Sequence, residues 1–151
     1  MRILLVTQYW SPETGVPQRR WAWLSEVLQH SGHEVFVIAP PPRSTLSRTR
    51  GTRIRTSQQA ANAAVAADSK ATVYRSYRPA TGDSISAKML EQLLVAAGQV
   101  VVGRKVFKDV EPAIVIGTVP AIPTAVVTFI LAKLGRVPYI IDPVSYTHLR
   151  A

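Results

Sequence analysis

Met1-Arg-Ile-Leu-Leu-Val-Thr-Gln-Tyr-Trp-Ser-Pro-Glu-Thr-Gly15 opens the chain and decides its fold. Ile3 to Val6 is an unbroken apolar run, which is typical of a strand buried on both faces. After a polar loop, Pro17 suits the start of a helix, and Gly32 suits the position just past its end. Where a strand leads through a loop into a helix, the free N–H groups of the first helical turn and the positive end of the helix dipole point at the same place. The sequence therefore predicts a phosphate-binding junction around Gly15.

The rest of the chain alternates between strand and helix patterns. Apolar runs predict four further strands, over residues 34–38, 71–74, 113–116 and 137–142. The strand over 113–116 is expected to be followed by a tight turn at 117–120. Helices are expected over residues 17–31, 85–108 and 122–134, with a short alanine-rich helix over 58–67. This order predicts an α/β fold with a doubly wound parallel (Rossmann-like) sheet and helices on both faces.

The helices carry apolar stripes and end signals that predict how they pack. In the first helix the stripe is Trp21, Leu24 and Leu28, with Val27 beside it; in the long helix it is Ile85, Met89, Leu93, Ala96 and Val100. Asp83 or Ser84 is expected to cap the long helix, and Gly135 to close the one after it. Tyr9 and Trp10 either stack on a ligand or fill the space between strand and helix, whereas His30 and His33 are expected to be structural.

Ligands of such sheets bind outside the carboxyl ends of the strands. In this sequence those ends are residues 7–16, 39–42, 75–78, 117–120 and Asp142. The first loop has one glycine where a dinucleotide fingerprint needs three, the sequence contains no P-loop, and Thr7 and Gln8 stand where a phosphorelay receiver has acidic residues. These absences argue against the commonest functions of this architecture.

Composition limits the partners. The chain has 151 residues, no cysteine and a net charge of +9, which indicates one domain without disulfides or thiolate metal sites and favours anionic partners. Five arginines gather in one polar stretch: Arg43, Arg48, Arg50, Arg53 and Arg55. This stretch is either a solvated loop or a contact to an anionic membrane, and its lack of aromatic residues argues against nucleic acid. Residues 121–132 are apolar but too short to span a membrane. We expect a cytoplasmic protein, either free in solution or peripheral on the inner face of the membrane.

Four blocks carry a resemblance to a known family: residues 1–21, Ser31-Gly-His-Glu-Val-Phe-Val-Ile-Ala-Pro-Pro41, Pro112-Ala-Ile-Val-Ile-Gly-Thr-Val-Pro120 and Gly135-Arg-Val-Pro-Tyr-Ile-Ile-Asp142. In order and spacing they resemble the N-terminal domain of a family 4 glycosyltransferase of the two-domain GT-B architecture. The resemblance implies a nucleotide-sugar donor bound mainly by a second domain, and a cell-envelope polysaccharide or lipid-linked acceptor. It implies no cofactor, no metal site and no nucleic-acid partner.

The resemblance also implies a set of substrate-binding residues and names no catalytic one. The set is Gly15, Val16, Arg19, Arg20, Thr118 and Asp142. The family usually has a second glycine where Val16 stands. Arg19 and Arg20 either reach an anionic group or face water. Thr118 either lines the acceptor side or caps the next helix, and Asp142 either orients an acceptor hydroxyl or caps a following helix.

Residues 143–151 depart from the family pattern and resemble translated adaptor sequence. We therefore expect residues 1–142 to be an incomplete domain and 143–151 to be a non-native tail. On this interpretation the parent protein is a glycosyltransferase, and the fragment alone is inactive. The alternatives are a stand-alone basic α/β binding module for anionic ligands or nucleic acid, and a nucleotide-binding α/β protein of another chemistry.

Overall fold

A computed structural model of the chain describes residues 1–10, 16–42, 71–79, 82, 84–119 and 122–143. In chain order its elements are β1 (Arg2–Val6), α1 (Val16–His30), β2 (Glu34–Ala39), β3 (Thr72–Arg75), α4 (Ile85–Val110), β4 (Ile114–Val119), α5 (Ile122–Gly135) and β5 (Tyr139–Pro143). The predicted helix over 58–67 and the basic stretch over 43–55 lie outside the described residues.

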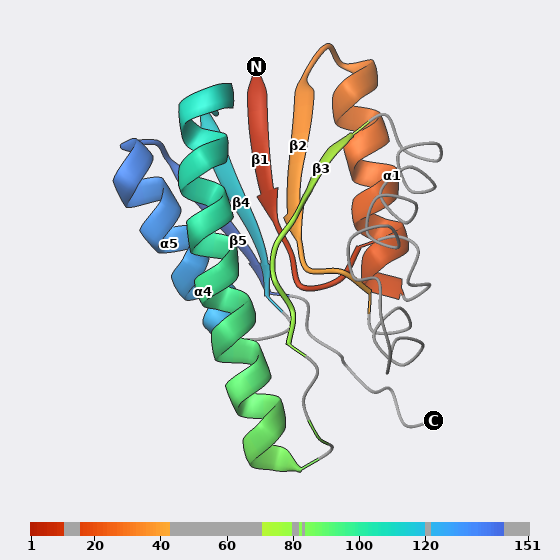
Figure 1. The fold of residues 1–151 in the computed structure, drawn as a ribbon. Coiled ribbons are helices and arrows are strands. Elements are labelled where there is room, and N and C mark those ends of the chain that lie inside the picture. The colour runs from red at the N-terminus through yellow and green to blue at the C-terminus, as the bar shows by residue number, and fades with distance from the viewer. Residues whose placement is uncertain (11–15, 43–70, 80–81, 83, 120–121, 144–151) are drawn as a thin grey trace, which may run out of the picture.

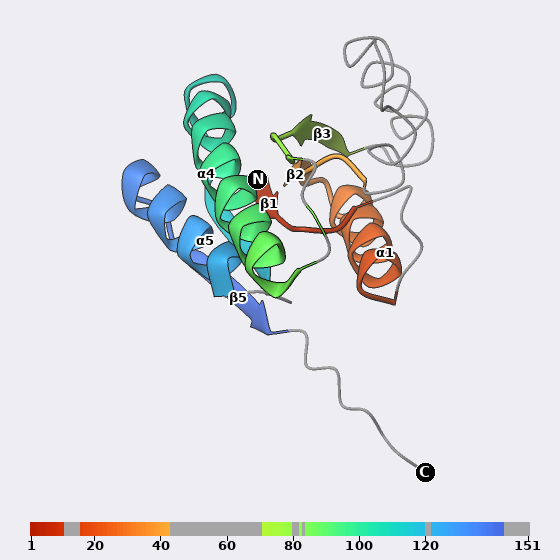
Figure 2. The same cartoon turned by 60° about the horizontal axis from the view of Figure 1, so that its bottom comes forward.

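The five strands form one parallel sheet in the order β3-β2-β1-β4-β5. β1 lies in the middle, so Leu4 has Phe36 of β2 on one side and Val115 of β4 on the other. α1 covers one face of the sheet, and α4 and α5 lie side by side on the other (Figures 1 and 2). The predicted doubly wound α/β fold is confirmed.

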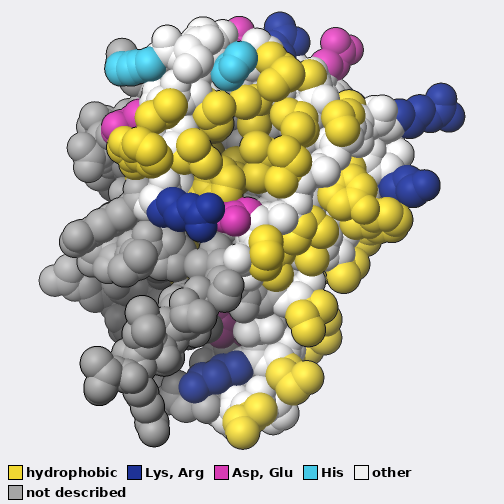
Figure 3. Space-filling view, turned by 180° about the vertical axis from the view of Figure 1, so that it is seen from behind, with side chains coloured by type: hydrophobic (Ala, Val, Ile, Leu, Met, Phe, Trp, Pro, Cys, Tyr) yellow, Lys and Arg dark blue, Asp and Glu magenta, His cyan; other side chains and the backbone are white. Residues whose placement is uncertain are grey.

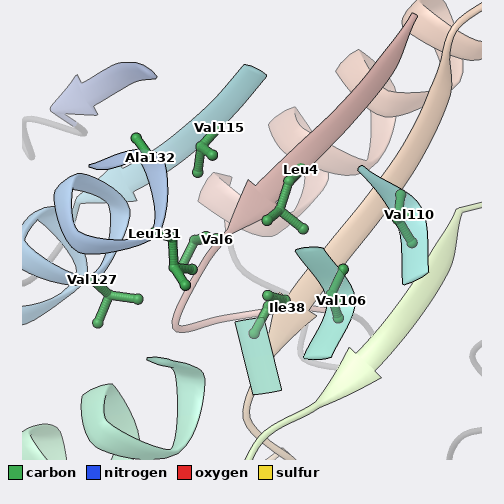
Figure 4. Packing of buried hydrophobic residues seen from close by; sticks show 9 residues of the cluster. All are labelled: Leu4, Val6, Ile38, Val106, Val110, Val115, Val127, Leu131 and Ala132. Atoms are coloured by element: carbon green, nitrogen blue, oxygen red, sulfur yellow. The ribbon is translucent and has the colours of Figure 1, made fainter. Parts of the chain in front are cut away.

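The core consists of two apolar clusters, one on each face of the sheet. Leu4, Val6 and Val115 point toward α4 and α5 and pack with Val106 and Leu131 (Figure 4). Leu5 of β1 and Val35 and Val37 of β2 point the other way, and they pack with Trp10, which follows β1, and with Trp21 of α1. Both faces of β1 are therefore buried, which explains why its sequence shows no polar alternation.

Helix ends and turns agree with the sequence at some positions and differ at others. Gly32 has a φ of 81°, and Ser84 accepts a hydrogen bond from the Ala87 N–H as the N-cap of α4, both as predicted. The residue that takes the left-handed conformation after α5 is Arg136, with a φ of 54°, and Gly135 stays in the helix. Gly135 has a packing role instead, since a Cβ there would overlap the Phe107 ring.

The predicted turn at 117–120 is wrong over its first three residues, because β4 continues to Val119. Gly117 pairs with Val6 of β1 and with Ile141 of β5, and Thr118 pairs with Asp142. Glycine had suggested a turn, but here its lack of a side chain allows α5 to approach β4, since a Cβ on Gly117 would overlap the Thr128 hydroxyl. The longer strand carries Thr118 to the edge of the sheet.

The apolar stripe predicted for α4 is wrong in its first half. Ile85 is 81% exposed and Leu93 is 59% exposed, and Met89 is exposed as well. The residues that face the sheet are Glu91, Val95, Gln99, Gly103, Val106 and Val110. The reason is that the first turns of α4 extend past the ends of the strands (Figure 1), where no sheet lies beneath them. In α1, by contrast, Trp21, Leu24 and Leu28 pack on the core as predicted, while Val27 is exposed.

By length and composition α4 is apolar enough to cross a membrane, with a mean hydropathy of 1.4 over its most apolar window. This helix lies outside the apolar stretch over 121–132, which is too short to span a membrane. Core helices of globular proteins can pass the same test, and one side of α4 does pack on the sheet. The other side is the unusual one, because it is both apolar and exposed.

Candidate functional site

The strand order creates a single switch point at the carboxyl edge of the sheet. From β1 the chain proceeds to β2 and β3 on one side, and later returns to form β4 and β5 on the other. The loops that follow β1 and β4 therefore diverge, and a crevice between diverging loops is where open α/β sheets bind ligands. Thr7 follows β1 and Thr118 lies near the end of β4, so both residues belong to this place.

Thr7 and Thr118 form a buried pair of hydroxyl groups at the switch point. The Thr118 Oγ1 donates a hydrogen bond to the Thr7 Oγ1 at 2.8 Å. The Thr7 hydroxyl in turn donates to the Tyr9 carbonyl at 3.0 Å and accepts from the Tyr9 N–H at 3.3 Å. Such side-chain-to-backbone bonds hold the chain in a turn. The pair therefore fixes the path of the chain after β1. Among the described residues the Thr118 hydroxyl is bonded to Thr7, and residues 120–121, which lead into α5, are outside the description.

Gln99 of α4 supports the same loop from the opposite face of the sheet. Its Nε2 donates to the Thr7 carbonyl at 2.8 Å, and the residue is completely buried. Its Oε1 has no hydrogen-bond partner among the described residues. A buried glutamine is expensive unless it forms hydrogen bonds, so its contact with Thr7 indicates that the end of β1 is held firmly from both faces.

Asp142 extends the polar row to a third strand and contacts α1. It lies opposite Thr118 in the register between β4 and β5, so the two side chains emerge on the same face. The Arg20 Nη2 donates to the Asp142 Oδ1 at 3.3 Å. The carboxylate is mostly covered at 19% exposure and its Oδ2 has no partner within the described part of the chain, whereas the Arg20 side chain is 53% exposed. This ion pair adds little stability, but it fixes the orientation of the carboxylate.

A buried arginine joins the ends of β1 and β2 to α4. The Arg78 Nη1 donates to the Pro41 carbonyl at 2.6 Å, and its Nη2 donates to the Gln8 carbonyl at 3.3 Å. Its Nε lies 3.4 Å from the Glu91 Oε1 of α4. Arg75 acts nearby, since its Nη1 donates to the Pro40 carbonyl at 3.0 Å. Together these contacts hold the proline-rich end of β2 against the β1 loop.

Sequence reasoning placed residues 75–78 at the carboxyl edge but gave neither arginine a role. The missed signal is the combination of two arginines, three residues apart after a strand, with three consecutive prolines after the neighbouring strand. Prolines lack the N–H that would continue a ladder, so this segment leaves the sheet, and the carbonyls of Pro40 and Pro41 accept from the arginines instead. Long guanidinium groups are the donors that can reach several carbonyls at once.

The predicted site residues are brought together in part. Arg20 contacts Asp142, and Asp142 is in register with Thr118. Val16 begins α1 and Arg19 lies in its first turn, but their side chains are outside what the structure describes, and so is Gly15. In the described residues no group of three His, Asp or Glu side chains is placed to hold a metal ion.

The two aromatic residues of the first loop do not share one role. Trp10 is buried in the cluster between the sheet and α1, so the interpretation as a packing residue is confirmed for it. Tyr9 is half-buried. His33 is at the amino edge of the sheet beside a pocket of about 310 Å³, opposite the polar row. His30 ends α1 at that same edge.

Comparison with known proteins identifies the fold. No protein-family model and no curated protein matches the sequence. Solved structures do match, among them the glycotransferase of kitacinnamycin, with a TM-score of 0.60 and 19% identity, covering 93% of this chain and 30% of that chain. Acinetobacter baumannii MurG matches with a TM-score of 0.54 and 14% identity, over 93% of this chain and 34% of that one. The C-terminal domain of PF1911 hydrogenase from Pyrococcus furiosus matches with a TM-score of 0.59 and 15% identity, over 94% of this chain and 90% of that one.

These likenesses establish a Rossmann-like fold of the kind found in GT-B glycosyltransferases. The identities are too low to carry more than the fold. The chain spans about a third of the length of the glycosyltransferases that it matches, 30% of one and 34% of the other.

Proposed function

We propose that this chain is the acceptor-side domain of a GT-B glycosyltransferase of family 4. The parent protein would transfer a sugar from a nucleotide-sugar donor to a cell-envelope polysaccharide or a lipid-linked acceptor in the cytoplasm. The observation that carries the proposal is the polar row of Thr7, Thr118 and Asp142 across three adjacent strands at the switch point, with Arg20 on the carboxylate. The fold shared with glycosyltransferases supports it.

The exposure of β5 supports the proposal that residues 1–142 are an incomplete domain. Parallel strands of doubly wound sheets are normally covered on both faces. In β5, Tyr139 and Ile141 point to the α5 side and Ile140 points to the α1 side, yet all three are exposed, Ile140 by 51%. Apolar side chains also form a broad patch on the face seen in Figure 3. A further strand beside β5, with helices on both faces, would cover these side chains.

Each residue of the site would have its own role in sugar transfer. Asp142 would accept a hydrogen bond from the acceptor hydroxyl, and Arg20 would hold the carboxylate in place for it. Thr7 and Thr118 would hold the β1 loop in the position at which it can contact the donor. The backbone N–H groups at Gly15 and Val16, at the start of α1, would bind the donor diphosphate and stabilise its charge as it leaves. A second domain would bind the rest of the donor.

The first test is the genomic DNA downstream of the codon for Asp142. A reading frame that continues into a second α/β domain is expected. The complete protein would then be assayed with a panel of nucleotide sugars for transfer and for donor hydrolysis, and the 151-residue chain alone is expected to be inactive. If the natural gene ends at Ala151, the glycosyltransferase proposal fails.

The second test addresses the site in the complete protein. Asp142→Asn is expected to lower kcat/KM by about 10-fold, because a neutral amide oxygen accepts the hydrogen bond of the acceptor hydroxyl more weakly than a carboxylate does. Glu34→Gln is the matched control: Glu34 is an exposed carboxylate that pairs with Arg2 at 3.4 Å at the amino edge of the sheet. Equal activity of Asp142→Asn and the unchanged protein would rule out the role given to Asp142.

One observation bears on the alternative of a stand-alone basic α/β binding module. The hydrogenase domain, residues 78–226 of a longer protein, has nearly the same length as this chain and is matched over 90% of it, so the fold occurs as a domain of this size. A basic module would be retained on DNA or on phosphate resins in a salt-dependent manner. Retention of the 151-residue chain on DNA at physiological salt, together with a gene that ends at Ala151, would favour this alternative.

A further inference from the structure

A pocket lies between the ends of α4 and α5, at the amino edge of the sheet. The two helices lie side by side (Figures 1 and 2), and each ends just before a parallel strand begins. The pocket has a volume of about 530 Å³, which is within the range of pockets that bind small molecules. Thr118 and Asp142 lie at the opposite edge of the sheet, so the pocket is separate from the candidate site.

Two glycines bring α4 and α5 into close contact beside the pocket. A Cβ on Gly103 of α4 would overlap the Leu131 side chain of α5, and a Cβ on Gly135 of α5 would overlap the Phe107 ring of α4. Leu131 and Phe107 both line the pocket. Each of them therefore packs against the backbone of the neighbouring helix, which makes the wall of the pocket rigid.

The inside of the pocket is apolar and continuous with the core. Leu131 is completely buried, and Phe107 and Val137 pack against the same core cluster. Pro112, which is buried, lines the pocket where α4 passes into β4, and Leu134 lines its outer side and is 53% exposed. These walls are in place without a ligand, as in most small-molecule sites, so an apolar group can enter without rearranging the core.

Two basic side chains accompany this apolar interior. Arg104 and Lys108 line the pocket from α4, and residues four apart are neighbours on the surface of a helix. Both are exposed, and neither forms an ion pair with another described residue. The acidic residue of the lining, Glu111, is three residues past Lys108 and seven past Arg104. An anion that lies between Arg104 and Lys108 is therefore closer to positive than to negative charge.

The partial negative charge at the end of α4 does not cancel this preference. The last carbonyls of a helix attract cations when they have no partner. Here the Phe107 carbonyl accepts from the Glu111 N–H at 3.2 Å, and the Val110 carbonyl accepts from the Arg2 Nη1 at 2.8 Å. Two carbonyls of the last turn are thus already bonded, and Arg2 brings a further positive charge to the end of the helix.

We propose that this pocket binds a small carboxylic acid with an apolar body, in its ionised form. The apolar body would lie against Phe107, Leu131 and Val137, and the carboxylate would accept hydrogen bonds from Arg104 and Lys108. A guanidinium has parallel donors that match the two oxygens of a carboxylate, and the ammonium group adds a second charge-assisted bond. Exposed basic residues alone are usually only solvated, and it is their place beside a preformed apolar pocket that selects this class of ligand.

The test is a calorimetric titration of the 151-residue chain with octanoate, kept below its micelle concentration. One octanoate is expected to bind per chain, with a Kd on the order of 100 µM. Octanamide has the same apolar body without the charge and should bind about 10-fold more weakly. Acetate lacks the apolar body and should bind at least about 100-fold more weakly. Nuclear Overhauser effects from the octanoate methyl group to the methyl groups of Leu131, Leu134 and Val137 should place the ligand.

Charge variants of α4 test the role of the two basic residues. R104Q/K108Q is expected to bind octanoate about 10-fold more weakly and octanamide as well as the unchanged chain does. The matched control K88Q/K105Q also removes two positive charges from exposed residues of α4, but neither residue lines the pocket. Its affinity for octanoate should equal that of the unchanged chain, and circular dichroism should show the same helix content for all variants.

Four outcomes would overturn the proposal. They are the absence of saturable binding, equal affinity for octanoate and octanamide, equal weakening by R104Q/K108Q and K88Q/K105Q, and Overhauser effects to Phe129 and Tyr139 instead of the pocket. The last would place octanoate on the exposed apolar surface of α5 and β5. The proposal does not rest on sugar transfer, and the titration contains neither donor nor acceptor, so its failure leaves the transferase proposal standing.

Discussion

Arg78→Met removes the guanidinium that joins α4 to the ends of β1 and β2. The change leaves the Glu91 carboxylate buried without this partner, which costs about 3–5 kcal/mol for a broken buried ion pair. It also removes the donors of the Pro41 and Gln8 carbonyls, for about 1 kcal/mol each. The expected loss is therefore about 5–7 kcal/mol, a large part of the roughly 5–15 kcal/mol that stabilises a typical domain.

The double variant R78M/E91L separates these contributions. It removes both charges, so the cost of the unpaired carboxylate disappears and about 2 kcal/mol from the two carbonyls remains. The double variant is thus expected to be more stable than Arg78→Met alone. Arg78→Lys is expected to fall between them, because one ammonium group keeps the charge but does not match the fork of a guanidinium.

The assay is urea unfolding followed by the fluorescence of the buried Trp10 and Trp21, with the free energy of unfolding taken by linear extrapolation. The reasoning is refuted if the free energy of unfolding of Arg78→Met lies within about 1 kcal/mol of that of the unchanged chain, because a broken buried ion pair costs more than that. It is also refuted if R78M/E91L is no more stable than the single variant, since the Arg78–Glu91 pair would then contribute nothing.

Three further changes test the packing, the cap and the exposed ion pair. Gly117→Ala should destabilise by about 1–3 kcal/mol, because the new methyl group overlaps the Thr128 side chain, its hydroxyl most of all. G117A/T128A removes the hydroxyl and should recover part of that loss in urea unfolding, and no recovery would contradict the packing argument. Ser84→Ala removes the N-cap of α4 and should lower the thermal stability by about 1 kcal/mol, and an unchanged midpoint would count against the cap. Arg20→Ala breaks an exposed contact with Asp142 and should change the free energy of unfolding by less than about 1 kcal/mol, so a larger loss would mean that the pair is structural.

The sequence allowed the sheet to be predicted because its strands are apolar on both faces. Ile3 to Val6 and Ile114 to Ile116 are unbroken runs, and only a parallel sheet between two helical layers buries such runs. The carboxyl-edge rule placed Thr118 and Asp142 at the same edge of the sheet, and the structure adds that they are in register on adjacent strands. It could not predict the contact of Arg20 with Asp142, since 122 residues separate them and the contact depends on how α1 lies over the sheet.

The stripe of α4 could not be predicted from periodicity, because period analysis assumes that the apolar side of a helix faces the core. Glu91 and Gln99 face inward since each has a buried partner, and the sequence gives no sign of the partners Arg78 and Thr7. Arg78 itself was missed for a related reason. Arginine is normally a surface residue, and only the three-dimensional arrangement shows that two carbonyls and a carboxylate converge on it.

The central place of β1 has a consequence for the order of events during synthesis. β1 pairs with β2 soon after both have been made, but its other partner, β4, follows much later. Val110, the last residue of α4 and still ahead of β4 in the chain, is already 108 positions from Arg2. At the usual rates of translation the first strand waits roughly 5–20 s for that neighbour. During this interval an apolar strand edge is open on the ribosome, which is the condition under which nascent chains recruit chaperones. The switch point is therefore assembled late, and the hydroxyl pair of Thr7 and Thr118 would serve as a reporter of its completion.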